Sequence, residues 1–267
     1  MSKKSTLNTL LELKAQKETF SCLTAYDACF SHFISTAGVE VILVGDSLGM
    51  VLQGRDSTIP VSIEDMVYHT QCVAQGNDNS LIMADMPFMT YGTPEQTLSN
   101  AAKLMRAGAE LVKLEGGEWL NPSIKQLNDC GIPSCVHLGL TPQSVHKFGG
   151  YKVQGRSPEA AEQLLREAKA AQQAGAAMLL LECVPSSVGK TVTQAVDIPV
   201  IGIGAGPDTD GQVLVLHDML GLTPHKPAKF VKNFMADANG SIQDAIAAFH
   251  SDVKTHRFPG DEHGFSA

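Results

Sequence analysis

Several short apolar segments of this chain each end on a residue that can carry charge. These terminal residues are Asp46, Asp85, Glu115, His137 and Glu182. The preceding runs are apolar enough to be typical of strands buried on both faces of a parallel sheet. An ionised carboxylate in such surroundings is costly unless it is paired or bound to a cation. Polar residues that recur at the carboxyl ends of buried strands therefore predict an active site.

Side chains alternate along a strand, and this alternation indicates which polar groups point the same way. In the segment 111–115, Lys113 and Glu115 share one face, and two apolar residues share the other. We expect the apolar face to pack under helices, so that Lys113 and Glu115 point into the space enclosed by the strands. The same alternation places Asp85 and Glu182 on the inner faces of their own strands.

Three carboxylates from consecutive predicted strands, Asp46, Asp85 and Glu115, would meet at one end of the sheet, with Lys113 beside them. Such a group repels itself unless a cation or protons intervene. Oxygen ligands without clustered histidine or cysteine favour Mg²⁺ over zinc. The alternative is that these acids pair with arginines or cap helices, and Asp46, which is followed by Ser47, is the best candidate for a cap.

Glu182 follows the sixth predicted strand, roughly across from the three acids, and could act as a general base. The alternative is a strand-end acid that accepts hydrogen bonds from backbone amides. His137 could bind or polarise a substrate, or it could be structural. Because chelation of a 2-oxo acid by a metal acidifies the adjacent C–H bond, this arrangement suits enolate formation.

The elements that must position these residues alternate between strand and helix. Strands are predicted near residues 20–25, 41–46, 81–86, 111–115, 134–138, 178–183, 199–204 and 213–217. Helical patterns lie between most of them, and capping residues before proline, as at Thr93 and Ser157, mark helix starts. About eight such units in roughly 250 residues are typical of a single-domain (β/α)₈ TIM barrel, here over residues 1–267. An open, doubly wound sheet is the alternative, and no glycine-rich turn after the first strand supports it.

Two segments lie outside this repeat. Residues 1–18 form a predicted N-terminal helical extension, because Leu7, Leu10 and Leu11 have helical spacing and would pack on the amino-terminal end of the barrel. Residues 139–156 contain several glycines and show little periodicity. Since a loop of this length in a compact domain is usually functional, we predict an active-site loop there, such as a lid.

Composition excludes several classes of protein. The formal charge of −8 and the lack of a basic block argue against a nucleic-acid partner. The six cysteines form no C-x-x-C pair, which predicts reduced thiols in a cytoplasmic protein. No apolar stretch is long enough for a membrane span, and the first residues lack the apolar core of a signal peptide. We therefore expect no membrane partner.

Several motifs of this chain are similar in amino-acid sequence to those of a known family. In chain order, the motifs are V-G-D-S-L-G-M from Val44, A-D-M-P-F from Ala84, V-K-L-E-G-G from Val112, H-L-G-L-T-P-Q from His137, F-G-G-Y-K-V-Q-G-R from Phe148, L-E-C-V-P from Leu181 and I-G-I-G-A-G from Ile201. Over roughly residues 20–265, the chain resembles the ketopantoate (3-methyl-2-oxobutanoate) hydroxymethyltransferases.

This resemblance implies an enzyme of pantothenate biosynthesis, a (β/α)₈ barrel that commonly assembles as a homodecamer. It implies transfer of the one-carbon unit of 5,10-methylenetetrahydrofolate to 3-methyl-2-oxobutanoate, which gives 2-dehydropantoate. One Mg²⁺ per subunit would be held by Asp46, Asp85 and Glu115, and Glu182 would accept the proton. The 2-oxo acid would be bound by Asp46, Ser47, Asp85 and Lys113, and the strand-end position of His137 adds this residue to the set.

Two other classes share some of these features. A Mg²⁺-dependent barrel lyase or mutase of the isocitrate lyase and phosphoenolpyruvate mutase kind would use the same metal and enolate without folate, but no K-K-C-G-H-type loop occurs. A scaffold with a vestigial site would have broken motifs, and none is broken. Lys147, Lys152 and Arg156 could meet the glutamate tail of folate, or they could simply be solvated.

Overall fold

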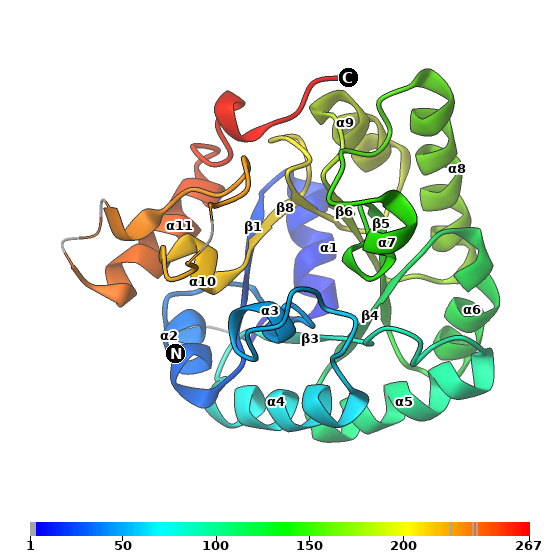
Figure 1. Ribbon diagram of the computed structural model, residues 1–267, viewed down its shortest axis with the longest axis horizontal. Coiled ribbons are helices and arrows are strands. Elements are labelled where there is room, and N and C mark those ends of the chain that lie inside the picture. The colour runs from blue at the N-terminus through cyan, green and yellow to red at the C-terminus, as the bar shows by residue number, and fades with distance from the viewer. Residues whose placement is uncertain (1–3, 225, 237, 239) are drawn as a thin grey trace.

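A closed barrel of parallel strands forms the centre of the molecule (Figure 1). The structure is a computed structural model that describes residues 4–224, 226–236, 238 and 240–267. The strands are β1 Phe20–Thr24, β2 Val41–Val44, β3 Leu81–Asp85, β4 Leu111–Glu115, β5 Ser134–Gly139, β6 Met178–Glu182, β7 Val200–Ile203 and β8 Gly211–Leu214. Each strand pairs with its neighbours in the chain, and β8 pairs with β1. The predicted (β/α)₈ barrel is confirmed, and the open sheet is wrong.

Helices surround the barrel, as Figure 1 shows. They are α1 Leu7–Gln16, α2 Ala28–Thr36, α3 Leu48–Val51, α4 Ile63–Gly76, α5 Pro94–Ala107, α6 Asn121–Asp129, α7 Val145–Phe148, α8 Pro158–Ala174, α9 Ser186–Ala195, α10 Leu216–Met219 and α11 Ile242–Lys254. Thr93 and Ser157 cap α5 and α8 as predicted, each accepting a backbone N–H bond three residues later. The outward side chains Val112 and Leu114 of β4 belong to the apolar layer between strands and helices. This packing leaves the alternate residues of the strand pointing inward.

The amino-terminal end of the barrel is closed by α1. Leu10 is fully buried and packs with the inward side chains of the strands, and Leu7 and Leu13 pack at the edge of the same cluster. Lys14 Nζ lies 2.7 Å from Asp210 Oδ2, just ahead of β8. The predicted N-terminal helix is confirmed from residue 7, and residues 1–3 of the extension lie outside the described residues.

Three sequence-based expectations about these elements need correction. Leu11 is 42% exposed and does not join the barrel contact. The last strand begins at Gly211 rather than 213, because its first residue pairs with Phe20 of β1, and the chain after Leu214 turns into α10. The segment 139–156 is not without secondary structure, since it contains a 3₁₀ turn over Pro142–Ser144 and the helix α7.

No helix among the described residues has the length and apolar character needed to cross a bilayer.

Candidate active site

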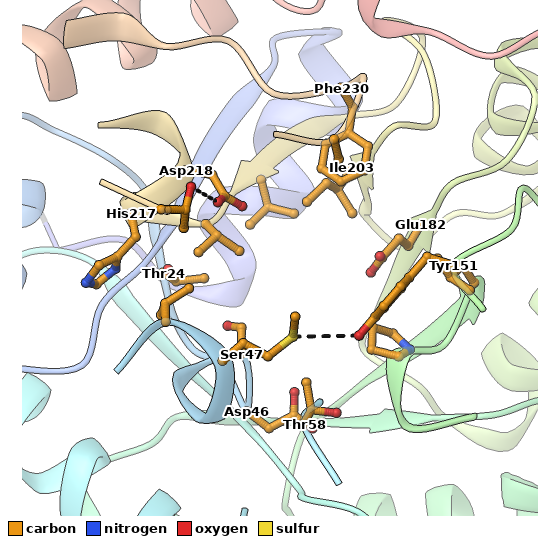
Figure 2. Close-up of a pocket in the computed structure, with 18 of the residues that line it drawn as sticks. Thr24, Asp46, Ser47, Thr58, Tyr151, Glu182, Ile203, His217, Asp218 and Phe230 are labelled. Carbon is orange, nitrogen blue, oxygen red and sulfur yellow. Dashed lines mark hydrogen bonds between the residues drawn. The ribbon is translucent and has the colours of Figure 1, made fainter. Parts of the chain in front are cut away.

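The carboxyl-terminal ends of the strands open into a cavity of about 900 Å³. Every site residue predicted from the sequence lines it, namely Asp46, Ser47, Asp85, Lys113, Glu115, His137 and Glu182. Figure 2 shows Asp46 and Ser47 on one side of the cavity, with Glu182 and Tyr151 on another. The barrel therefore gathers side chains from distant parts of the chain into one space.

Lys113 lies at the centre of the charged residues. Its Nζ is 2.8 Å from Asp85 Oδ1 and 3.8 Å from Glu115 Oε1. The strand register places Asp85 of β3 directly beside Lys113 of β4, so this pair follows from the barrel itself. Burial by itself would lower the pKa of Lys113, but the carboxylates of Asp85 and Glu115 outweigh it and raise that pKa. Lys113 is thus a fixed ammonium at the mouth of the barrel.

Asp46 follows β2 and is held by Gln143. Gln143 Nε2 donates to Asp46 Oδ2 at 2.8 Å, and the Asp46 N–H donates to Asp85 Oδ2 at 3.0 Å. The short helix α3 begins after Ser47 without a side-chain cap, so the helix-cap interpretation of Asp46 is not what the structure shows. Burial, and then the nearby charges of Asp85 and Glu115, raise the pKa of Asp46 well above its usual range. The site holds more negative charge than its described cations balance.

Glu115 has both of its carboxylate oxygens in contact with neighbours. Oε2 accepts the Gln143 N–H at 3.0 Å, and Oε1 lies 3.3 Å from His137 Nδ1. Burial raises the pKa of Glu115, but His137, Lys113 and the Gln143 N–H outweigh burial and lower it overall. Glu115 is therefore a firmly ionised group that is already bound on both sides.

His137 joins this cluster to Glu182. Its Nε2 lies 3.4 Å from Glu182 Oε2, and its Nδ1 lies 3.2 Å from Lys113 Nζ. Burial and Lys113 lower the pKa of His137, but Glu115 and Glu182 raise it further, to about 9. A protonated ring donates from both nitrogens, so it can face two carboxylates at once. Among the described residues no backbone amide donates to the Glu182 side chain, which leaves the backbone-bonded interpretation without support.

The main chain beneath Glu182 is held by Gly139. The two residues pair across β5 and β6. A Cβ at Gly139 would lie 2.3 Å from the Glu182 carbonyl oxygen, and the φ of +88° is one that glycine adopts most easily. The Leu140 N–H donates to the same oxygen at 2.8 Å. The backbone position of Glu182 is thus set by direct contact between two strand ends.

Sequence reasoning missed several residues of the site. Gln143, only 4% exposed, bridges two of the predicted acids, and the Tyr91 hydroxyl donates to its Oε1. Tyr26 OH lies 2.9 Å from Ser47 Oγ, and Tyr151 OH lies 3.7 Å from Met50 Sδ across the opening (Figure 2). A polar amide in the turn after β5, at the end of H-L-G-L-T-P-Q, was the available signal for Gln143.

Lys147, Lys152 and Arg156 are exposed, in agreement with the alternative in which they are solvated. The cavity lining contains none of Lys147, Lys152 and Arg156. Apart from Lys113, the lysines and arginines that line the cavity among the described residues are Arg55, Lys226 and Lys229. The other alternative, in which Lys147, Lys152 and Arg156 meet the glutamate tail of folate, therefore finds no support in the lining of this cavity.

The donor atoms suit a hard divalent cation, although they are not arranged as a finished metal site. Among the residues that the structure describes, no three His, Cys, Asp or Glu side chains are gathered closely enough to hold a metal ion. Asp46 Oδ1, however, accepts no hydrogen bond from a described residue, and burial together with the charges of Asp85 and Glu115 raises the pKa of Asp46. Carboxylate oxygens are the ligands that Mg²⁺ prefers. Asp46, with Oδ1 unengaged, is more available than Asp85 and Glu115, whose carboxylate oxygens all contact neighbouring residues.

Comparisons with known proteins match nearly the whole chain to one family. The model of the ketopantoate hydroxymethyltransferase family matches residues 4–261. A 3-methyl-2-oxobutanoate hydroxymethyltransferase from Marinobacter nauticus is 60% identical over 98% of this chain and 99% of its own length. Another from Marinomonas sp. is 59% identical over 100% of this chain and 97% of its own.

Solved structures share the fold at low sequence identity. Phosphonopyruvate hydrolase in complex with oxalate and Mg²⁺ aligns with a TM-score of 0.61 at 12% identity, covering 79% of this chain and 80% of that one. 2,3-Dimethylmalate lyase aligns with a TM-score of 0.56 at 14% identity, covering 78% of this chain and 80% of its own. These likenesses concern the barrel fold alone.

Proposed function

The chain belongs to the ketopantoate hydroxymethyltransferase family, and from this premise we propose that it converts 3-methyl-2-oxobutanoate to 2-dehydropantoate with 5,10-methylenetetrahydrofolate as donor. In this reaction the C3–H bond of the acid breaks and a bond forms between C3 and the methylene carbon. Both methylene–nitrogen bonds of the folate break. Water supplies the hydroxyl group, and the two remaining protons reach the nitrogens of tetrahydrofolate.

One observation carries this proposal: the charged side chains at the ends of β3 to β6 form one connected network in a single cavity. We assign Glu182 as the group that accepts the C3 proton, since its carboxylate borders the cavity beside His137. His137 holds Glu182 by hydrogen bonding. Lys113 places a fixed positive charge where the keto oxygen becomes negative, which stabilises a developing enolate.

The remaining residues bind and orient the acid. Ser47 is held toward the cavity by its hydrogen bond with Tyr26, and together with Asp46, Asp85 and Lys113 it would contact the 2-oxo acid. Asp46, Asp85 and Glu115 would hold Mg²⁺, with Glu115 serving mainly through its charge because its oxygens are engaged. Bound Mg²⁺ would polarise the keto group and so acidify the C3–H bond.

Proton exchange at C3 tests this proposal without the donor. In D₂O with Mg²⁺, proton NMR of 3-methyl-2-oxobutanoate should show protein-dependent loss of the C3 proton. Glu182→Gln should slow this exchange by about 10²–10⁴-fold, because general-base catalysis contributes that much. Glu162→Gln, on the exposed face of α8, serves as the matched control. Failure of the unaltered protein to exchange would overturn the enolate step, and normal exchange by Glu182→Gln would overturn the assignment of the base.

The homodecamer is an expectation from the family, whereas the compartment and the active-site loop are expectations from the sequence. We propose a homodecamer in the cytoplasm, with residues 139–156 as the active-site loop. Gln143 and Tyr151 support the last point, since both are part of that segment and both contact residues of the cavity. Light scattering tests the assembly, and a molar mass of a single subunit would contradict it.

A further inference from the structure

The cavity is larger than the 2-oxo acid requires. Pockets of roughly 300–1,000 Å³ hold ligands of drug size, and this cavity measures about 900 Å³. The charged network described above occupies the side formed by β3 to β6. The side formed by β7, β8 and β1 lies across the closed barrel, and no residue assigned to the 2-oxo acid or to the metal comes from those strands. That side is free to bind the second reactant.

A single carboxylate, Asp218 of α10, stands on this second side. Figure 2 shows it across the cavity from Glu182, near Thr24. Thr223 Oγ1 donates to Asp218 Oδ1 at 3.0 Å, which fixes the orientation of the carboxylate. Asp218 forms no salt bridge with any described residue, and its Oδ2 accepts no hydrogen bond from one. A carboxylate that is oriented but not neutralised has capacity for a ligand that donates hydrogen bonds.

The donor of the proposed reaction carries a matching group. Its pteridine ring presents the 2-amino group and the adjacent ring N–H side by side, two donors in one plane. A carboxylate accepts such a pair through two parallel hydrogen bonds, in the way that it accepts a guanidinium. We propose that Asp218 is the residue that recognises the pteridine ring of the folate donor, through this pair of hydrogen bonds. The inference rests on the proposed function, because it names the site of the second substrate.

The surroundings of Asp218 suit a flat ring with a charged tail. Ile203 and Phe230 supply apolar surface between Asp218 and the Glu182 side of the cavity, as Figure 2 shows. The cations Arg55 and Lys229 are exposed and lie at the rim, where the glutamate tail of a folate would leave the cavity. Burial raises the pKa of Asp218. Two hydrogen-bond donors from a ligand would compensate for this loss of solvation.

The first test uses the unaltered protein. With Mg²⁺ and saturating 3-methyl-2-oxobutanoate, calorimetry under anaerobic conditions compares the binding of tetrahydropterin with that of its 2-desamino analogue. The analogue lacks one of the two donors, so it should bind about ten- to a hundredfold more weakly, the usual effect of losing a hydrogen bond to a charged group. Equal affinity for the two rings would overturn the inference. Because this experiment uses only the unaltered protein, its result does not depend on whether a variant folds.

The second test uses Asp218→Asn, whose amide presents a donor toward the donors of the ring. The KM for methylenetetrahydrofolate should rise by about ten- to a hundredfold, and the preference for tetrahydropterin over the analogue should disappear. Asp208→Asn, an exposed acid outside the cavity lining, is the matched control. A preserved preference in Asp218→Asn would overturn the inference.

The two proposals fail in distinguishable ways. If the unaltered protein neither exchanges the C3 proton nor forms 2-dehydropantoate, the proposed function is wrong. If it does both and Asp218→Asn keeps its KM for the folate, only the role of Asp218 is wrong.

Discussion

The two ends of the barrel bury acidic side chains in different ways. At the amino-terminal end, Asp210 accepts from Lys14 Nζ at 2.7 Å and from the Val200 N–H at 2.8 Å. Glu40, at the entry to β2, accepts the Ser21 N–H at 2.8 Å. Each acid there has donors of its own, which is how a structural carboxylate is usually stabilised.

At the carboxyl-terminal end, several acids share one ammonium. Asp85 and Glu115 both contact Lys113, and burial and these two acids raise the pKa of Asp46 by more than Lys113 and Gln143 lower it. Buried charge that is left uncompensated costs stability. Burial raises the pKa of Asp210 as well, so the two ends differ in counter-charge: each structural acid has its own donors, whereas the acids of the binding end share Lys113.

The largest expected effect separates Lys113 from Lys14, two lysines that each pair with an acid at opposite ends of the barrel. Lys113→Met should lower the rate of the proposed transfer by about 10²–10³-fold, because it removes a preorganised charge from the developing oxyanion. Lys14→Met should leave kcat nearly unchanged but lower the free energy of unfolding by about 2 kcal/mol, because Asp210 loses its partner. Steady-state kinetics and urea denaturation measure the two effects. A comparable loss of activity in both variants would break the distinction between the ends.

The pH dependence of stability tests the same difference in counter-charge. The pKa of His137 rises from 6.5 to about 9 on folding, so the protonated ring stabilises the fold fully below pH 6.5. That contribution is lost as the pH rises from 6.5 through about 9, and it amounts to at most about 3 kcal/mol. Urea denaturation in EDTA should show this decline, and His137→Asn should reduce it. An unchanged slope in that variant would contradict the assignment.

The smallest effect is a difference in sign between two acids. Asp46→Asn should raise the free energy of unfolding in EDTA by about 1 kcal/mol, because it removes a buried carboxyl group whose charge is disfavoured by burial and by Asp85 and Glu115. Glu40→Gln should lower that free energy by about 1–2 kcal/mol, because Glu40 accepts from Ser21 and pairs with Lys254 at 3.2 Å. Destabilisation by both substitutions would show that the two ends do not differ in this respect.

Much of this arrangement could be predicted from local pattern. The apolar runs located the strands, and alternation along 111–115 correctly turned Lys113 and Glu115 inward. Once the strands close into a barrel, residues at equivalent strand ends must come together. For this reason all the predicted residues line one cavity, although their roles in catalysis and metal binding remain predictions.

The rest depended on contacts that local spacing does not encode. Gln143 lies after β5, but only the turn at Pro142–Ser144 carries its amide between Asp46 and Glu115. Asp218 belongs to the short helix α10, whose first two residues the sequence predicts as the end of a strand. Leu11 has the same helical spacing as Leu10, and only the docking angle of α1 decides which of them is buried.

The contact between Gly139 and the Glu182 carbonyl restricts which residues position 139 can accommodate. Even a methyl group at position 139 would meet main-chain atoms, which cannot move aside as a flexible side chain can. In a library covering every substitution, we expect position 139 to be among the least permissive of the barrel, although the residue has no functional group. Directed evolution of this scaffold should therefore leave that strand end untouched and diversify the opposite side of the opening.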